Sequence, residues 1–168
     1  KTAYEIRNCD WSSTCALPIF CHDVAQICQT PISLVTLIDN RRQWFKAKVG
    51  LELESTPREV SFCAHAIELP VGPFVVPDAR EDARFRDNPL VTDEPLIRFY
   101  AGVPVEDAAG NRLGAICAID REPRALSEHQ LDSLQRLALE ASQILMSISK
   151  DGDAGFPPET LALLQEFE

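Results

Sequence analysis

Two alternating stretches joined by a short polar break constrain the fold of this chain more than any other feature. Apolar side chains occupy every second position in residues 97–105, and the same alternation returns in residues 113–119. A period of two is typical of β-strands. The break contains Gly110-Asn111, two residues that tolerate positive φ, so a tight reversal is expected there. We therefore predict a β-hairpin over 97–120, whose second strand is apolar on both sides and is expected to be central and covered on both faces.

Composition limits the classes of function. A chain of 168 residues with 45% hydrophobic residues can bury one core, so we expect one domain with tails. The net charge of -10 disfavours binding to nucleic acid or to an anionic membrane, because both partners attract basic surfaces. No apolar run approaches the roughly 18 residues that span a bilayer, and the start does not resemble a signal peptide, so a cytoplasmic location is expected. The six cysteines include no Cys-x-x-Cys pair, and we interpret them as reduced thiols.

The two ends of the chain differ from its middle. Residues 1–19 have no consistent helical or strand period, and their opening can be back-translated into codons that resemble a sequencing-library adapter. Our hypothesis is that 1–19 is a non-native segment, so its Cys9 and Cys15 carry no weight. We expect a domain over 20–149, followed over 150–168 by a linker and the truncated start of a further element.

The remaining elements follow from hydrophobic periods and stop signals. They are expected in this order: a helix over 20–28, a hairpin with strands 32–38 and 43–49, a helix from Thr56 through 67, a strand at 74–77, a crossing segment with a short helix at 78–92, and a long helix from Ser127 to about Lys150. Thr56 is the expected cap of its helix because Pro57 and Glu59 follow it. Phe85 and Leu90 are the expected anchors of the crossing segment. This order predicts an α+β fold with an antiparallel sheet of five or six strands and helices packed on it.

Residues 20–148 resemble a GAF domain, a relative of the PAS sensory fold. The residues that carry the resemblance lie at 33–51, 61–67, 75–91 and 97–124. The resemblance implies a sensory module of a bacterial signalling protein, found beside histidine kinase, diguanylate cyclase or phosphodiesterase output domains and usually not an enzyme. It also implies a ligand pocket between one sheet face and the segments 61–67 and 78–92.

Six residues are candidates for contact with a small-molecule ligand of unknown identity: Cys63, His65, Arg98, Tyr100, Cys117 and Trp44. Arg98 and Tyr100 share one face of the central hairpin, where a guanidinium and a phenol suit an anionic ligand. On that hypothesis, removing Arg98 weakens binding and leaves folding stability nearly unchanged. The alternative is a surface arginine paired with Asp93 or Glu94. Trp44 precedes Phe45 on a strand, so the two rings are expected on opposite faces.

No catalytic residue and no metal site is predicted. Cys63 and His65 are two residues apart, which places them on different sides of a helix, and His65 is also consistent with a histidine packed in a core. The three histidines have no paired spacing for a metal. Cys21-His22, the pair that resembles a bilin attachment site, lies in the wrong part of a GAF fold, and the signature of cyclic-nucleotide-binding GAF domains is missing. Two alternatives stay open: a thiol enzyme resembling the methionine sulfoxide reductases, using Cys63 or Cys117, and a dimerisation module without ligand.

The long C-terminal helix is expected to form a homodimer and to carry a signal to an output domain. Its apolar residues follow an a/d heptad pattern at Leu131, Leu134, Ala138, Ala141, Leu145 and Ile148, with Leu137 and Ile144 one heptad apart beside it. One stripe is expected to cover the sheet and the other to meet a partner.

Overall fold

The computed structural model describes residues 16–70 and 72–150, with side chains up to residue 146. Its elements are, in chain order, α2 (Ala16–Cys28), β1 (Ile32–Ile38), β2 (Arg42–Val49), β3 (Ser55–Pro57), the 3₁₀ turn η1 (Arg58–Val60), α3 (Phe62–Glu68), β4 (Phe74–Val76), α4 (Pro89–Thr92), β5 (Phe99–Glu106), β6 (Arg112–Asp120) and α5 (Glu128–Lys150).

The strands form one antiparallel sheet of six strands in the order β3-β2-β1-β6-β5-β4. The predicted α+β class and both predicted hairpins are therefore confirmed. Strand β6 lies between β1 and β5, as its apolar character on both faces indicated. The β5–β6 turn has Gly110 at a φ of 84°, a conformation in which a side chain would be strained. Strand β5 begins at Phe99 rather than at Ile97, because the Ile97 N–H donates to the carbonyl of Leu90 instead of joining the ladder.

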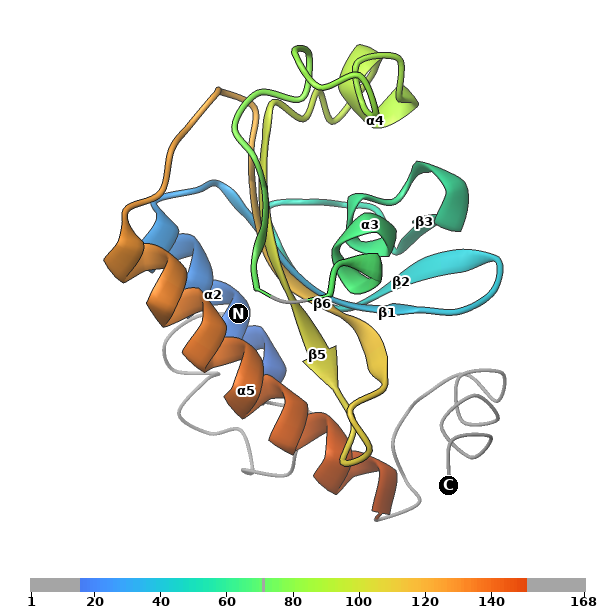
Figure 1. Ribbon diagram of the computed structural model, residues 1–168, viewed down its shortest axis with the longest axis vertical. Coiled ribbons are helices and arrows are strands. Elements are labelled where there is room, and N and C mark those ends of the chain that lie inside the picture. The colour runs from blue at the N-terminus through green and yellow to red at the C-terminus, as the bar shows by residue number, and fades with distance from the viewer. Residues whose placement is uncertain (1–15, 71, 151–168) are drawn as a thin grey trace.

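Two layers cover the two faces of the sheet (Figure 1). Helices α2 and α5 lie side by side on one face, while α3 and the crossing segment 77–96 cover the other. Consecutive residues of β5 consequently enter different cores. Phe99 packs with the α2 and α5 side chains and Tyr100 packs under α3, and both are fully buried.

Helix α2 begins earlier than the sequence analysis assumed. It starts at Ala16, and Leu17 is buried among the residues of the α2/α5 core. The last residues of the segment 1–19, from Ala16 on, therefore belong to the packed domain. The remainder of 1–19, including Cys9 and Cys15, lies outside the described residues, as does the predicted linker beyond Lys150.

The prediction that Thr56 caps a helix is wrong. Thr56 lies in β3 and pairs with Gln43 of β2, so its backbone is extended. The cap of α3 is Ser61, whose Oγ accepts a hydrogen bond from the N–H of Ala64 at 3.1 Å. Ser61 also bonds to the Gln43 side chain, which fixes the start of α3 to the sheet.

The crossing segment contains the expected short helix, α4. Asn88 caps it by accepting from the Leu90 N–H at 2.9 Å, and its amide donates to the carbonyl of Val60 at 3.0 Å. Phe85 is a buried anchor, as predicted. The second deep anchor is Val91, and Leu90 is only half-buried.

Helix α5 begins with the predicted cap. The Ser127 Oγ accepts from the Gln130 N–H at 3.2 Å, and the Gln130 side chain accepts from the Ser127 N–H at 2.9 Å. The heptad stripe is used inside the domain, because Leu134, Ala138, Ala141 and Leu145 are buried against the sheet and α2. The neighbouring stripe also packs inside the domain, since Leu137 is buried and Ile144 packs against the same core. Ile148 lies outside the described side chains. Among the described side chains of α5, the large apolar one that is exposed is Leu139, at 68%.

Within the described residues, the longest and most apolar helical segments fall short of what crossing a membrane requires.

Candidate functional site

A phenol and two thiols meet in the core beneath α3. The Tyr100 hydroxyl donates to the Sγ of Cys63 at 3.0 Å, and the Cys63 and Cys117 Sγ atoms are 3.9 Å apart. The three side chains come from β5, α3 and β6, and each is at most 1% exposed. We call these three residues the Cys-Tyr cluster.

Gly102 makes room for this arrangement. A Cβ atom at Gly102 would lie 2.2 Å from the Tyr100 hydroxyl oxygen, closer than non-bonded atoms can approach. A glycine within a strand often marks such a close approach. The phenol can therefore lie along the sheet and reach Cys63 because residue 102 has no side chain.

Burial and hydrogen bonding set the acidities of the cluster. Burial raises the pKa values of Tyr100 and Cys117 well above their ordinary ranges, because their charged forms would lose contact with water. Burial also opposes ionisation of Cys63, but hydrogen bonds from Cys117, Thr36 and Tyr100 together outweigh it and lower the pKa of that thiol. Cys63 is therefore the member of the cluster that loses a proton most readily.

A small cavity of about 20 Å³ adjoins the cluster. Cys63 and Tyr100 contribute to its wall, and the other lining residues are mostly apolar, among them Phe45, Phe62 and Ile97. This volume suits about one water molecule. An organic ligand would need the crossing segment to move away.

Arg98 holds the crossing segment over this cavity. Its Nη1 donates to the carbonyls of Val91 at 2.7 Å and Ile97 at 3.2 Å, which ties α4 to the start of β5. Arg121 adds a second tie, because its Nε donates to the Pro95 carbonyl at 3.0 Å. The Arg98 guanidinium thus contacts carbonyls of its own chain in this structure. Removing Arg98 is therefore expected to lower folding stability, contrary to the prediction from the sequence.

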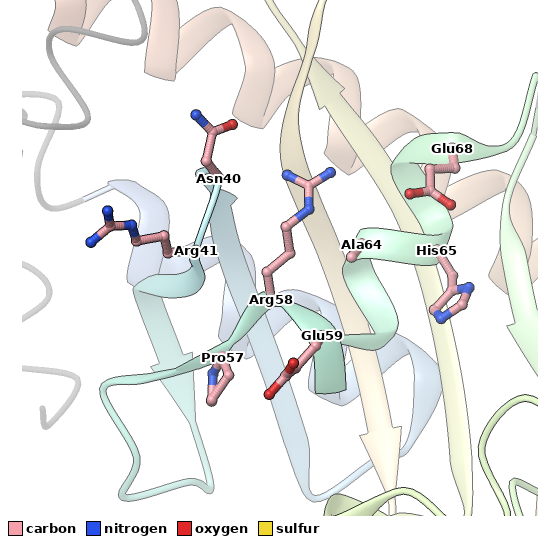
Figure 2. Close-up of a pocket in the computed structure, with 8 residues that line it drawn as sticks. All are labelled: Asn40, Arg41, Pro57, Arg58, Glu59, Ala64, His65 and Glu68. Atoms are coloured by element: carbon pink, nitrogen blue, oxygen red, sulfur yellow. The ribbon is translucent and has the colours of Figure 1, made fainter.

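A larger pocket of about 510 Å³ opens on the other side of α3 (Figure 2). We call it the surface pocket, and its lining residues are Asn40, Arg41, Pro57, Arg58, Glu59, Ala64, His65 and Glu68. Two backbone segments meet there, since the Arg58 Nη1 donates to the Asp39 carbonyl at 2.9 Å and the Arg58 N–H to the Arg41 carbonyl at 2.9 Å. Two guanidinium groups and an imidazole on its wall suit a small acid, and Glu59 and Glu68 favour one that also carries hydrogen-bond donors.

The six predicted site residues therefore separate into groups. Cys63, Tyr100 and Cys117 come together in the Cys-Tyr cluster, and Arg98 holds the segment above it. His65 instead borders the surface pocket, and its ring packs on Phe85, with ring centroids 4.9 Å apart. Trp44 packs on the opposite sheet face, toward α2 and α5, while Phe45 lines the small cavity.

Sequence reasoning missed Arg41, Arg58 and Gly102. Arg41 directly follows the Asp39-Asn40 turn, and that position on an exposed turn was the available signal. Gly102 interrupts an alternating strand, which is itself a sign of a close approach. Arg58 carried no comparable signal, because its place depends on the pairing of β3 with β2.

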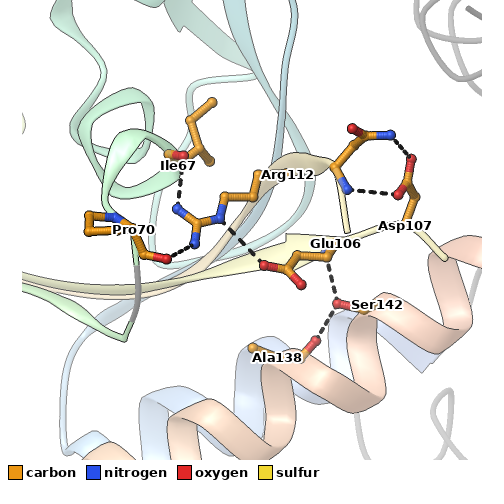
Figure 3. A network of polar contacts seen from close by, with 8 residues as sticks. Ile67, Pro70, Glu106, Asp107, Arg112, Ala138 and Ser142 are labelled. Carbon is orange, nitrogen blue, oxygen red and sulfur yellow. Dashed lines mark hydrogen bonds and ion pairs between the residues drawn. The ribbon is translucent and has the colours of Figure 1, made fainter. Parts of the chain in front are cut away.

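A chain of polar contacts runs from the end of α3 to α5 (Figure 3). The Arg112 guanidinium donates to the carbonyls of Ile67 at 3.1 Å and Pro70 at 2.7 Å, and its Nε lies 3.4 Å from a Glu106 carboxylate oxygen. The Glu106 N–H donates to the Ser142 Oγ at 3.0 Å, and that hydroxyl donates to the Ala138 carbonyl at 2.7 Å. These contacts connect the end of α3 with the long helix through the β5–β6 hairpin.

No three metal-binding side chains gather in the parts of the chain that the structure describes.

Comparisons with known proteins agree on the family. The family described as "GAF domain" matches residues 8–145. A cyclic di-GMP phosphodiesterase of Pseudomonas aeruginosa is 54% identical over 111 residues, which cover 66% of this chain and 19% of that protein. The chain thus spans about a fifth of the length of this relative.

Solved structures show the same fold. The GAF domain of a phosphoenolpyruvate-protein phosphotransferase from Coxiella burnetii has a TM-score of 0.70 at 15% identity, over 89% of this chain and 90% of that one. The corresponding domain from Acinetobacter has a TM-score of 0.69 at 20% identity, over 89% and 91%. A type II free methionine-R-sulfoxide reductase from Thermoplasma acidophilum has a TM-score of 0.65 at 14% identity, over 80% and 93%. At these identities the similarity is one of fold, because one fold carries many functions.

Proposed function

Because the chain belongs to the GAF domain family, we propose that it is a regulatory domain that senses a small molecule and is not itself an enzyme. The observation that supports this proposal is the position of α3. On one side α3 contributes Cys63 to the Cys-Tyr cluster, and on the other it contributes Ala64 and His65 to the surface pocket. A ligand in that pocket would contact the same helix that is linked through Arg112 to the hairpin and α5.

The ligand that we propose is a small acid. Arg41 and Arg58 would hold its anionic group, and His65 would contact it from α3. The Cys-Tyr cluster would then lie on the opposite side of α3 from the ligand, and Arg98 would hold the crossing segment over the cluster. Trp44 has no role in this proposal, because it faces the other core.

The output is proposed to lie in another part of a longer protein. The relative from Pseudomonas aeruginosa is named a cyclic di-GMP phosphodiesterase and is about five times as long as the matched region. We propose an output domain of that kind, or a histidine kinase or diguanylate cyclase, in the cytoplasm. Helix α5 is the proposed route of the signal to that output domain, and two copies are proposed to pair along its exposed side.

A thermal-shift titration with small carboxylates and with inorganic phosphate tests the ligand class. We expect at least one acid to raise the melting temperature in a concentration-dependent way, because a ligand that binds the folded state stabilises it. The Arg58→Gln variant should lose this rise, and Arg136→Gln, which removes an exposed arginine from α5, should keep it. A rise that survives in Arg58→Gln would contradict the assignment of the surface pocket.

The second candidate function is a thiol reductase, which the Cys63–Cys117 contact favours. Its substrate would have to reach sulfur atoms that adjoin a cavity of only about 20 Å³. Free methionine sulfoxide is far larger than the single water molecule that such a cavity holds. We therefore expect no turnover of methionine sulfoxide, and measurable turnover that depends on Cys63 would favour the enzyme over the sensor.

A further inference from the structure

The two thiols of the Cys-Tyr cluster are placed as a pair. Their Sγ atoms are 3.9 Å apart, and they come from positions 63 and 117, on elements that pack directly on one another. The other described cysteines are not paired in this way. Cys21 and Cys28 lie on one helix, seven positions apart, which is about 10 Å along the axis and too far for a bridge.

We propose that Cys63 and Cys117 form a disulfide when the domain meets a small hydroperoxide, so that the Cys-Tyr cluster is an oxidant-sensing site. This inference deepens the proposed sensory function, because it names a signal for the same helix, but it does not require a ligand in the surface pocket. Three features of the cluster support it: the contact between the thiols, the hydroxyl that donates to one of them, and the cavity beside them.

The cavity selects the oxidant by size. Cys63 and Tyr100 both border its volume of about 20 Å³. A water-sized space of this kind can receive hydrogen peroxide after a small movement of the crossing segment, whereas an organic disulfide such as oxidised glutathione is excluded. The oxidant class is therefore a small hydroperoxide rather than a thiol-exchange partner.

The chemistry balances in two steps. The Cys63 thiolate attacks one peroxide oxygen, the O–O bond breaks, and Cys63 becomes a sulfenic acid while the other oxygen leaves and takes up a proton as water. The Cys117 sulfur then attacks the sulfenic sulfur, the S–O bond breaks, and the hydroxyl leaves as a second water with the Cys117 proton. In total two thiols and one hydrogen peroxide give one disulfide and two waters. Tyr100 assists the first step by donating its hydrogen bond to the attacking sulfur.

The bridge would change the position of α3. A disulfide has an S–S distance of about 2.05 Å, whereas the two sulfur atoms are now 3.9 Å apart. The two side chains must rotate or α3 must move toward β6, and we expect the Tyr100–Cys63 hydrogen bond to be lost. Since α3 forms one wall of the surface pocket and its last turn is held by Arg112, a movement of α3 on bridging would reach both the pocket and the Arg112 contacts.

Peptide mapping of the unmodified chain tests the proposal. The fully reduced protein is treated with increasing hydrogen peroxide, unfolded, alkylated at the remaining thiols and digested without reductant. We expect a linked pair of peptides that contain Cys63 and Cys117, lighter by two hydrogen atoms than the sum of the free peptides. Alkylated Cys63 and Cys117 at peroxide concentrations that oxidise other cysteines of the chain would overturn the proposal, and so would a link from Cys63 to any other cysteine.

Single substitutions assign the roles of the two thiols. In Cys117→Ser, a sulfenic acid should accumulate on Cys63 and react with a 1,3-dicarbonyl trapping reagent, and in Cys63→Ser, Cys117 should stay reduced. Tyr100→Phe should slow formation of the bridge by about fivefold, the effect of losing one hydrogen bond to the attacking sulfur. Cys28→Ala removes a buried thiol on the other sheet face and should behave like the unmodified chain. Trapping on Cys117 rather than Cys63 would contradict the order of the two steps.

The outcomes for the two proposals can be told apart. The bridge is read by mass in the absence of any small acid, and the thermal-shift titration is performed on the reduced protein. A bridge without a response to acids would remove the surface pocket from the proposed function and leave the oxidant site intact.

Discussion

At the scale of single residues, the site depends on the fit between Tyr100 and Gly102. The phenol is fully buried, yet its hydroxyl has a partner in Cys63, so the polar group is not left unsatisfied in the core. That partner is within reach because the phenol lies over a residue without a Cβ. A tyrosine and a glycine two positions apart on one strand thus act as one structural unit.

Gly102→Ala tests this fit. The added Cβ would lie 2.2 Å from the Tyr100 oxygen and 2.7 Å from its Cζ, so the ring must move in a packed core. We expect a loss of about 1–3 kcal/mol in the free energy of unfolding, the usual cost of overpacking, measured by urea denaturation. The double variant with Tyr100→Phe should recover part of the loss, because it removes the atom of closest approach. Equal losses in the single and double variants would show that the hydroxyl is not the point of conflict.

Asp39 anchors the β1–β2 turn that leads into the surface pocket. Its Oδ1 accepts from the N–H groups of Arg41 at 2.8 Å and Arg42 at 2.7 Å. Partial burial opposes ionisation of this carboxyl, but these two hydrogen bonds and the Arg42 side chain together lower its pKa. Because the pKa is lower in the folded state, the charge of Asp39 stabilises the fold above its unfolded pKa of about 3.9 and stops doing so as pH falls through the folded value.

The substitution Asp39→Asn keeps the shape of the side chain and removes its charge. We expect the variant to be less stable by about 1 kcal/mol at neutral pH, the size of one hydrogen-bond term. The difference from the unmodified chain should shrink as pH falls below about 3.9, as measured by urea denaturation at a series of pH values. A difference that stays constant into strong acid would mean that the charge of Asp39 does not matter to the turn.

At the scale of elements, the crossing segment is held down by a small number of side chains. Phe85 and Val91 enter the core. Arg98 and Arg121 bond to the carbonyls of Val91 and Pro95 near its end, and Asn88 bonds to a carbonyl just before α3. Much of the rest is polar and exposed between Glu81 and Asp87. A segment with few buried anchors opens at a lower free energy than the sheet below it. It is therefore the element whose opening would admit a ligand or an oxidant to the Cys-Tyr cluster.

Arg98→Ala tests how this segment is held. Removing the guanidinium leaves the Val91 carbonyl without its charged donor, so we expect a loss of about 1.5–3 kcal/mol in stability and faster amide hydrogen exchange across residues 89–97. Arg86→Ala is the matched control, because Arg86 lies on the same segment with its side chain 62% exposed. Unchanged exchange in Arg98→Ala would show that Arg98 does not hold the segment closed.

Local sequence signals predicted the elements whose structure is determined locally. Both long hairpins follow from alternation and from turn residues, and α5 follows from its period and the Ser127 cap. The start of α3 was misplaced because Thr56-Pro57 satisfies the pattern of a cap, whereas its backbone is taken up by pairing with β2. That pairing depends on two segments meeting in space, which no local pattern reports.

The candidate site was predictable in part for the same reason. The sequence analysis grouped Cys63, Tyr100 and Cys117 as candidates for one ligand site; the three side chains meet in a buried cluster, and their contact with a ligand stays a prediction. The sequence alone did not determine which sheet face each side chain occupies, so Trp44 was grouped with residues of the other face. His65 was also grouped with Cys63, but it borders the surface pocket, whereas Cys63 borders the small cavity.

At the scale of the whole molecule, the exposed side of α5 is the proposed surface between two copies. Leu139 is 68% exposed on a helix whose other apolar side chains mostly pack inward. Light scattering should give twice the chain mass of 18.7 kDa, and Leu139→Glu should shift the mass toward that of one chain. Arg86→Gln changes an exposed position on the crossing segment, away from α5, and should leave the mass unchanged. A single-chain mass for the unmodified protein at high concentration would contradict pairing in this chain.

Native mass spectrometry of the chain purified from a bacterial host tests the sensory function most directly, because a ligand held in the surface pocket adds its own mass. We predict a population heavier than the bare chain by the mass of one small acid. This population should be absent from Arg58→Gln and present in Arg136→Gln. The bare mass in all three proteins, or an added mass that persists in Arg58→Gln, would contradict a small-acid sensor built on the pocket beside α3.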